Sequence, residues 1–156
     1  MRFLLLVIAL GSWVALATAA SFPAPVTPVA AVLEGDTPDP PLRWPLDGKF
    51  LQGYSYYHRG IDIGAAYGTP IGAAEGGWVE EVSYQAGYGI YVVVGDGSGI
   101  ETLYSHMADK AVEPGQRLAA GDLVGWVGAT GYATTPHLHF EVHVNGVRTN
   151  PLPYLP

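Results

Sequence analysis

Turn-forming sequences recur at short intervals from about residue 43 to the end of the chain, among them Asp47-Gly48, Asp96-Gly97-Ser98-Gly99 and Asn145-Gly146. The chain holds 21 glycines and 13 prolines, residues that interrupt helices and favour turns. Between the turns lie β-branched and aromatic runs of strand length, at residues 78–84, 90–96, 100–107, 123–130 and 137–144. No stretch carries a convincing helical period. The pattern predicts one mostly β domain over residues 43–156, with a hairpin at residues 96–99.

The first forty residues differ in character from the rest. Arg2 precedes an apolar run from Phe3 to Ala17, and small residues follow as far as Ala20. This layout is typical of a secretory signal peptide, over residues 1–20. The alternative is an uncleaved membrane anchor, for which the run is short, because a span needs about 20 apolar residues.

Residues 21–42 are rich in proline, which fixes φ and removes backbone donors, so they are predicted to form an extended linker. With the leader removed, we expect an exported protein that is periplasmic, associated with the cell wall or extracellular. It should have no stable membrane span.

Charge and cysteine content exclude several classes of function. The formal net charge is −7, with only seven lysines and arginines scattered along the chain, so a nucleic-acid partner is excluded. The chain has no cysteine. Disulfides, thiol nucleophiles and thiolate metal sites are therefore excluded, and any metal site must use histidine and carboxylate ligands.

Residues 137–144 read HLHFEVHV, which alternates like a half-buried strand. One face carries His137, His139, Glu141 and His143, and the core face carries Leu138, Phe140, Val142 and Val144. The first two histidines would lie about 6.6 Å apart along the strand, which allows them to serve one site. Taken alone, the pair is more typical of a solvated face. Glu141 and His143 share this face and could support the ligand side chains, but they are expected to be solvated.

The segment HRGIDIG places His58 four residues before Asp62. In a straight strand these side chains would lie about 13 Å apart, too far to share one ion. The chain must bend for them to meet, and Gly60 provides the backbone freedom. The alternative is a surface loop in which Asp62 caps a turn.

His106 belongs to the run at residues 100–107. Alternation puts it on the same face as Thr102 and Tyr104, and opposite Met107. A single histidine late in a strand is more often structural than catalytic. In combination, however, His58, Asp62 and one histidine of the His-x-His pair form a two-histidine, one-aspartate zinc set with an open fourth position. The remaining histidines are then candidates for proton transfer.

The segments that carry these residues resemble the lysostaphin-like zinc metalloendopeptidases, in order, over roughly residues 44–155. They are HRGIDIGAAYGTPIGAAEGGWV, GYGIYVVVGDGSGIETLYSHM, PGQRLAAGDLVGWVGATGY and TPHLHFEVHVNGVRTNPLPYL. The resemblance implies a compact domain of antiparallel sheets with a groove over a zinc ion (Zn2+). It implies His58, Asp62 and His139 as metal ligands and His106 and His137 as catalytic residues. Tyr132, just before the His-x-His pair, is a candidate substrate contact.

The resemblance also implies an activity, the hydrolysis of peptide bonds in peptidoglycan crosslinks or stem peptides. Glycyl bridges and direct D-alanyl-diaminopimelate crosslinks are both compatible with the sequence. We expect either His137 or His106 to act as general base, and favour His137 because it lies two residues from a ligand on the same face. The alternatives are a noncatalytic peptidoglycan-binding or hydrolase-activating module on the same fold, and a structural metal-binding protein of the cell envelope.

Overall fold

The computed structural model describes residues 41–156, and antiparallel β-strands make up most of this part of the chain. The strands are β1 (Lys49–Gln52), β2 (Ile61–Gly64), β3 (Pro70–Gly72), β4 (Gly77–Gln85), β5 (Gly89–Gly95), β6 (Ile100–Lys110), β7 (Arg117–Leu118), β8 (Leu123–Val127), β9 (His137–Val144) and β10 (Val147–Thr149). A short 3-10 helix follows at Leu152–Tyr154. The mostly β fold predicted from the turn pattern is confirmed, and each of the five expected strands is present.

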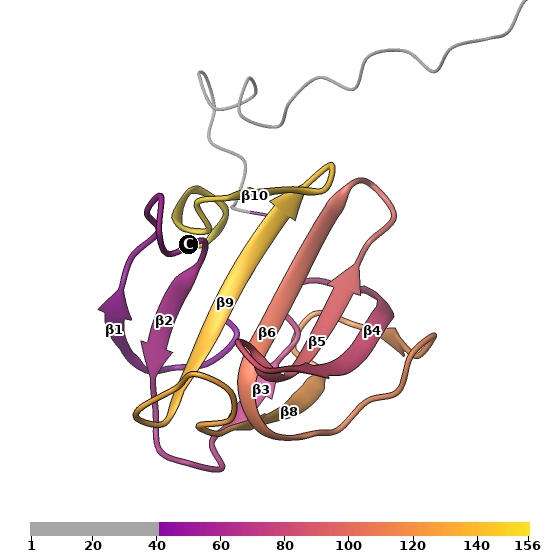
Figure 1. Ribbon diagram of the computed structural model, residues 1–156. Coiled ribbons are helices and arrows are strands. Elements are labelled where there is room, and N and C mark those ends of the chain that lie inside the picture. The colour runs from indigo at the N-terminus through magenta and orange to yellow at the C-terminus, as the bar shows by residue number, and fades with distance from the viewer. Residues whose placement is uncertain (1–40) are drawn as a thin grey trace, which may run out of the picture. The chain divides into compact units, whose positions relative to one another are not determined.

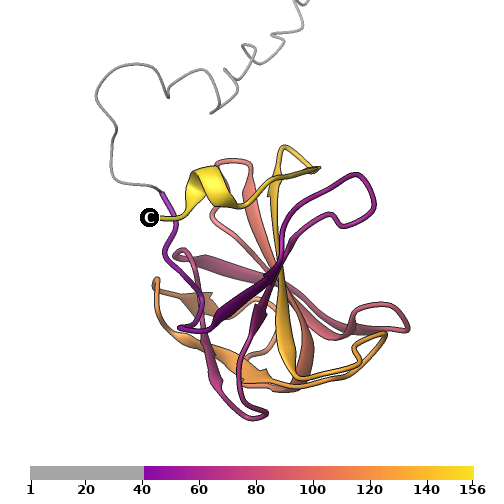
Figure 2. The ribbon, with the colours of Figure 1, turned by 90° about the vertical axis from the view of Figure 1, so that its left-hand side faces the viewer.

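The main sheet has the strand order β1-β2-β9-β6-β5-β4-β7 (Figure 1). β10 pairs with the last residues of β9, beyond the part that β2 reaches. β3 and β8 pair with each other, and β8 joins the end of β6. In the turned view, the C-terminal turn lies beside the start of the described chain (Figure 2), where Leu42 N donates to Tyr154 O. The predicted hairpin at residues 96–99 connects β5 to β6.

The hydrophobic core lies between the main sheet and the β3–β8 pair. On β9 the alternation is as expected, since Leu138, Phe140 and Val142 are fully buried. They pack with other buried side chains from neighbouring strands: Ile61, Ile63, Ile71, Val92, Val94, Tyr104, Met107, Val124 and Val127. The opposite face of β9 is thereby left facing outward, and this face carries the predicted site.

Strand β6 departs from the predicted alternation at His106. The pairing with β5 shifts between Tyr104 and Met107, so β6 has one extra residue there, which is a β-bulge. His106 adopts a φ of 60°, an unusual conformation for a residue with a side chain. The bulge turns His106 away from the face of Tyr104 and lets Met107 enter the core. The prediction that His106 shares a face with Thr102 and Tyr104 was therefore wrong.

The predicted signal peptide (1–20) and all but the last residues of the predicted linker (21–42) lie outside the described residues. Within residues 41–156, no helix has the length and apolar character needed to cross a membrane.

Candidate metal centre

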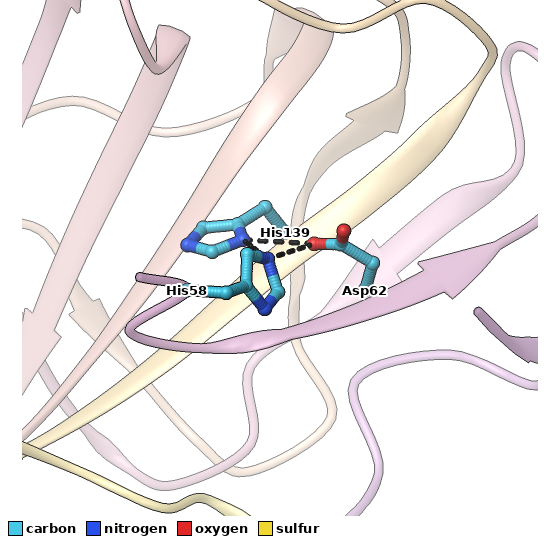
Figure 3. A group of neighbouring side chains, drawn as sticks. All are labelled: His58, Asp62 and His139. Atoms are coloured by element: carbon cyan, nitrogen blue, oxygen red, sulfur yellow. Dashed lines mark hydrogen bonds and ion pairs between the residues drawn. The ribbon is translucent and has the colours of Figure 1, made fainter. Parts of the chain in front are cut away.

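Strands β2 and β9 bring an aspartate and a histidine together. Asp62 and His139 are directly opposed in the antiparallel register, so both side chains project from the outward face of the sheet. Asp62 Oδ1 lies 2.8 Å from His139 Nδ1. His58 Nε2 lies 3.0 Å from each of these atoms. Figure 3 shows the three side chains pointing toward one another from β9, β2 and the loop before β2.

The loop before β2 brings His58 to this point because it bends at Gly60, as the sequence predicted. The role of Gly60 differs from the prediction in one respect, since it is not among the residues of positive φ. Instead it lies against the neighbouring strand. A Cβ there would be 2.5 Å from Phe140 O and 2.8 Å from His139 Cε1. The glycine is required by close approach rather than by backbone conformation.

The hydrogen bonds on the far side of each ring determine which nitrogen faces the centre. His58 Nδ1 lies 2.9 Å from Gly53 O, and a carbonyl oxygen only accepts, so Nδ1 carries the hydrogen. His139 Nε2 lies 3.1 Å from the carboxylate oxygen Glu141 Oε1, so Nε2 carries the hydrogen of the second ring. In the neutral rings, His58 Nε2 and His139 Nδ1 are therefore left with lone pairs that face each other and Asp62.

This arrangement fits a metal ion. Three atoms meet at 2.8–3.0 Å, and neutral histidines place no hydrogen between them, so their repulsion must be offset by a shared cation or by an added proton. Tetrahedral zinc with bonds of about 2.0–2.2 Å holds its ligand atoms about 3.4 Å apart, close to the separations here. Two imidazoles and one carboxylate are a donor set that zinc accepts, and they leave one position open.

The pKa values of Asp62 and His139 without an ion follow from the same contacts. Burial alone would raise the pKa of Asp62, but the hydrogen bond and charge of His139 outweigh it and lower that pKa. Burial alone would lower the pKa of His139, but the hydrogen bonds to Asp62 and Glu141 outweigh it and raise that pKa. The site thus attracts a positive charge, either a proton on His139 or a cation.

The other two predicted histidines lie beside the triad. The ring centroids of His106 and His137 are 4.7 Å apart, and His137 Nε2 lies 3.9 Å from Asp62 Oδ1. Each Nδ1 faces a backbone carbonyl at 2.8 Å, Thr130 O for His106 and Thr135 O for His137. In both neutral rings, Nε2 is therefore the nitrogen able to accept a proton. Burial lowers the pKa of His106, which favours its neutral form.

Glu141 was expected to be solvated, and that prediction was wrong. Its side chain is 1% exposed, and its two oxygens face four donors. Oε1 accepts from Tyr88 Oη at 2.6 Å and from His139 Nε2. Oε2 accepts from His143 Nε2 at 2.7 Å and from Arg148 Nε at 3.1 Å. Burial alone would raise the pKa of Glu141, but the hydrogen bonds from His139, His143 and Tyr88 outweigh it and lower that pKa. A buried carboxylate therefore fixes the orientation of the His139 ring. His143, also expected to be solvated, is half-buried.

Sequence reasoning missed Tyr88, Arg148 and Thr130. Tyr88 lies in the turn between β4 and β5, 53 residues from Glu141 in the chain, whereas Arg148 lies on β10, which pairs with β9. Thr130 precedes β9 and braces the bulge, because its Oγ1 donates to Met107 O at 2.7 Å and its carbonyl accepts from His106. The one available signal was the position of Glu141 two residues after His139 on the same strand face.

An open cleft of about 680 Å³ lies over the triad. Its floor holds the four histidines, Asp62 and Glu141, and its walls come from loops on several sides. The wall residues are Gln52, Tyr57, Arg59, Gln85, Gly87, Tyr88, Tyr132, Thr134 and Arg148. Tyr132, the predicted substrate contact, is 82% exposed and lines this cleft. The groove expected from the resemblance is therefore present.

Residues 56–151 match the model of peptidase family M23. An uncharacterized metalloprotease of Haemophilus influenzae is 39% identical over 73% of the chain, which spans 23% of that relative. The peptidoglycan DD-endopeptidase ShyC of Vibrio cholerae is 44% identical over 60% of the chain, which spans 22% of that relative. The chain thus spans less than a quarter of the length of these curated relatives.

Solved structures with the same fold include a zinc-containing peptidase from Vibrio cholerae. It has a TM-score of 0.66 and 29% identity, over 69% of this chain and 37% of that one. The catalytic domain of lysostaphin from Staphylococcus simulans has a TM-score of 0.65 and 31% identity, over 69% of this chain and 91% of that domain.

Proposed function

The chain belongs to peptidase family M23, as its resemblance to the lysostaphin-like enzymes predicted, and we propose that it is an exported zinc endopeptidase that hydrolyses peptide bonds of peptidoglycan. One observation carries the proposal. Three ligand atoms with lone pairs converge at 2.8–3.0 Å on the floor of an open cleft, and two further histidines with a free Nε2 line the same cleft. A metal site with an open position and adjacent proton acceptors is the arrangement of a hydrolytic centre.

In the proposed site, His58, Asp62 and His139 hold the zinc ion. When bound, zinc supplies Lewis-acid polarisation of a carbonyl and lowers the pKa of a water molecule. The chain's own residues provide the rest of the chemistry. Gly53 O and Glu141 hold the two ligand rings in the tautomers that present a lone pair to the ion.

His137 acts as general base and accepts the proton of the attacking water at Nε2. It is favoured over His106 because its Nε2 lies 3.9 Å from Asp62 Oδ1, at the edge of the triad. His106 lies beside His137, and its Nδ1 donates a hydrogen bond to Thr130 O. His106 helps to transfer a proton to the leaving amine. The exposed ring of Tyr132 forms part of the wall along which the substrate lies.

Export of the protein is part of the proposal. The leader at residues 1–20 and the proline-rich segment at residues 21–42 would place the domain at residues 43–156 outside the cytoplasm, where peptidoglycan is found. A relative at 44% identity is named as a peptidoglycan DD-endopeptidase, which supports the same substrate polymer for this chain.

The decisive experiment is digestion of purified peptidoglycan by the zinc-loaded protein, with the products identified by mass. Sacculi with direct crosslinks and sacculi with glycyl bridges are compared, and the His137→Ala variant serves as the inactive control. New peptide ends in at least one preparation are expected. Zinc bound in the expected amount with no cleavage of either preparation would refute the enzymatic function and favour a noncatalytic binding module.

A further inference from the structure

Two cationic side chains line the cleft, Arg59 and Arg148, and they differ in what neutralises their charge. Arg148 Nε donates to the buried carboxylate of Glu141 at 3.1 Å. Arg59 has no carboxylate within 4.0 Å among residues 41–156. Its contacts are the hydroxyl of Tyr54, at 3.1 Å from Nη1, and the ring of Tyr56, whose centre lies 4.9 Å from Cζ. Arg59 therefore brings an uncompensated positive charge to the cleft.

The guanidinium of Arg59 is held in place rather than swinging in solvent. The Tyr54 hydroxyl donates to Arg148 O at 3.1 Å, which leaves its oxygen lone pairs to accept from Arg59 Nη1. One of the five guanidinium N–H groups is used in this bond, and the other four remain for a ligand. A pre-positioned arginine loses little conformational freedom when it binds, and its fork matches a carboxylate in two parallel hydrogen bonds.

Arg59 is also close to the reaction centre along the chain. It follows the ligand His58, and consecutive Cα atoms are about 3.8 Å apart. An extended peptide advances about 3.3 Å per residue. A peptide bond lying over the triad would therefore have its nearest substituents within reach of this side chain. In a protein of formal net charge −7, a cation at this position is a specific attraction for a negative group of the substrate.

We propose that Arg59 binds a free carboxylate next to the scissile bond, and so selects direct diaminopimelate crosslinks over glycyl bridges. The inference rests on the proposed function and narrows its substrate. In a direct crosslink, the carbon that carries the scissile amide nitrogen also carries a free carboxylate. An internal glycyl residue has no such group, because its own carboxyl carbon forms the next amide. Arg59 is thus a specificity-determining residue.

The test compares three synthetic substrates on the zinc-loaded protein: a D-alanyl-diaminopimelate crosslinked peptide, the same peptide with the adjacent carboxylate converted to carboxamide, and pentaglycine. The wild type is expected to cleave the first with a KM about tenfold lower than the second, the size of effect that one charge-assisted hydrogen bond gives in a half-exposed site. Pentaglycine should be the poorest substrate.

Arg59→Gln should raise KM for the carboxylate peptide about tenfold, leave kcat nearly unchanged and leave the carboxamide peptide unaffected. Arg59→Lys keeps the charge without the fork and should fall between the two. Arg117→Gln is the matched control, because Arg117 contacts the ring of Trp78 outside the cleft and should change neither KM. Equal KM values of the wild type for the first two peptides, or equal losses on both in Arg59→Gln, would overturn the proposal.

Failure of the proposed function is distinguished by calorimetry with the same peptides. If the wild type cleaves nothing, tighter binding of the carboxylate peptide that disappears in Arg59→Gln supports the role of Arg59 and contradicts only the enzymatic activity. Equal affinities for the carboxylate and carboxamide peptides overturn the inference whether or not cleavage occurs.

Discussion

Replacement of Glu141 by glutamine should weaken zinc binding without touching a predicted metal ligand. The carboxylate accepts four hydrogen bonds, two at each oxygen. An amide of the same shape has one oxygen, so two of the four donors would face its NH2 group. If that group faces His139, it favours the tautomer with hydrogen on Nδ1, which is the atom turned toward Asp62 and His58.

The expected size of the effect follows from the contacts that are lost. Partners that orient a metal-ligating histidine are worth about 10–100-fold in metal affinity, and we expect zinc affinity to fall within this range. Hydrogen bonds to a charged group contribute about 1.5–3 kcal/mol each. Because Arg148 is half-exposed and can turn to water, only part of this should be lost. We expect the metal-free variant to be destabilised by about 2 kcal/mol.

Zinc affinity is measured by competition with a chromophoric chelator, and the stability of the metal-free protein by urea unfolding. Glu101→Gln is the matched control. Glu101 opposes His143 across the β6–β9 pair, with Oε2 3.5 Å from His143 Nδ1, so this variant makes the same charge change on the same face. It should leave zinc affinity within about twofold. Wild-type zinc affinity in Glu141→Gln, or equal weakening in both variants, would show that Glu141 does not orient His139.

Three further predictions concern single positions. His139→Ala should lose bound zinc, whereas His137→Ala should keep its zinc and lose turnover; metal analysis beside peptide cleavage separates them, and full zinc in His139→Ala would exclude it as a ligand. Gly60→Ala places a Cβ 2.5 Å from Phe140 O and should cost about 1–3 kcal/mol of unfolding free energy and weaken zinc binding, whereas Gly87→Ala, with open space around its Cβ, should not. Burial, with the charge of Asp96 nearby, raises the pKa of Glu75 from 4.5 to about 8. Its contribution to stability is therefore full below about pH 4.5 and is lost as the pH rises through 8, by at most about 4–5 kcal/mol. Urea unfolding should show Glu75→Gln matching the wild type at pH 5 and exceeding it at pH 9, and parallel pH profiles would contradict this.

Patterns of short range were readable from the chain itself. The spacing of turn residues and β-branched runs predicted the strands because side-chain alternation and turn conformation depend on residues one or two positions apart. The core face of β9 followed from the same rule. Bulk composition limited the metal ligands to histidine and carboxylate, because the chain has no cysteine.

The tertiary structure decided which of these residues meet, and it reversed two predictions. Alternation placed His106 on the same face as Thr102 and Tyr104, but the bulge before Met107, braced by Thr130 from another loop, turns it toward His137. Alternation gave no sign that Glu141 is buried, because Tyr88 reaches it from a turn 53 residues away in the chain and Arg148 reaches it from β10, which pairs with β9. Strand periodicity indicates only the face of the sheet from which a side chain projects. Contacts between distant segments decide whether that face is open to water and whether a β-bulge shifts the strand register by one residue. The local sequence pattern does not contain these contacts.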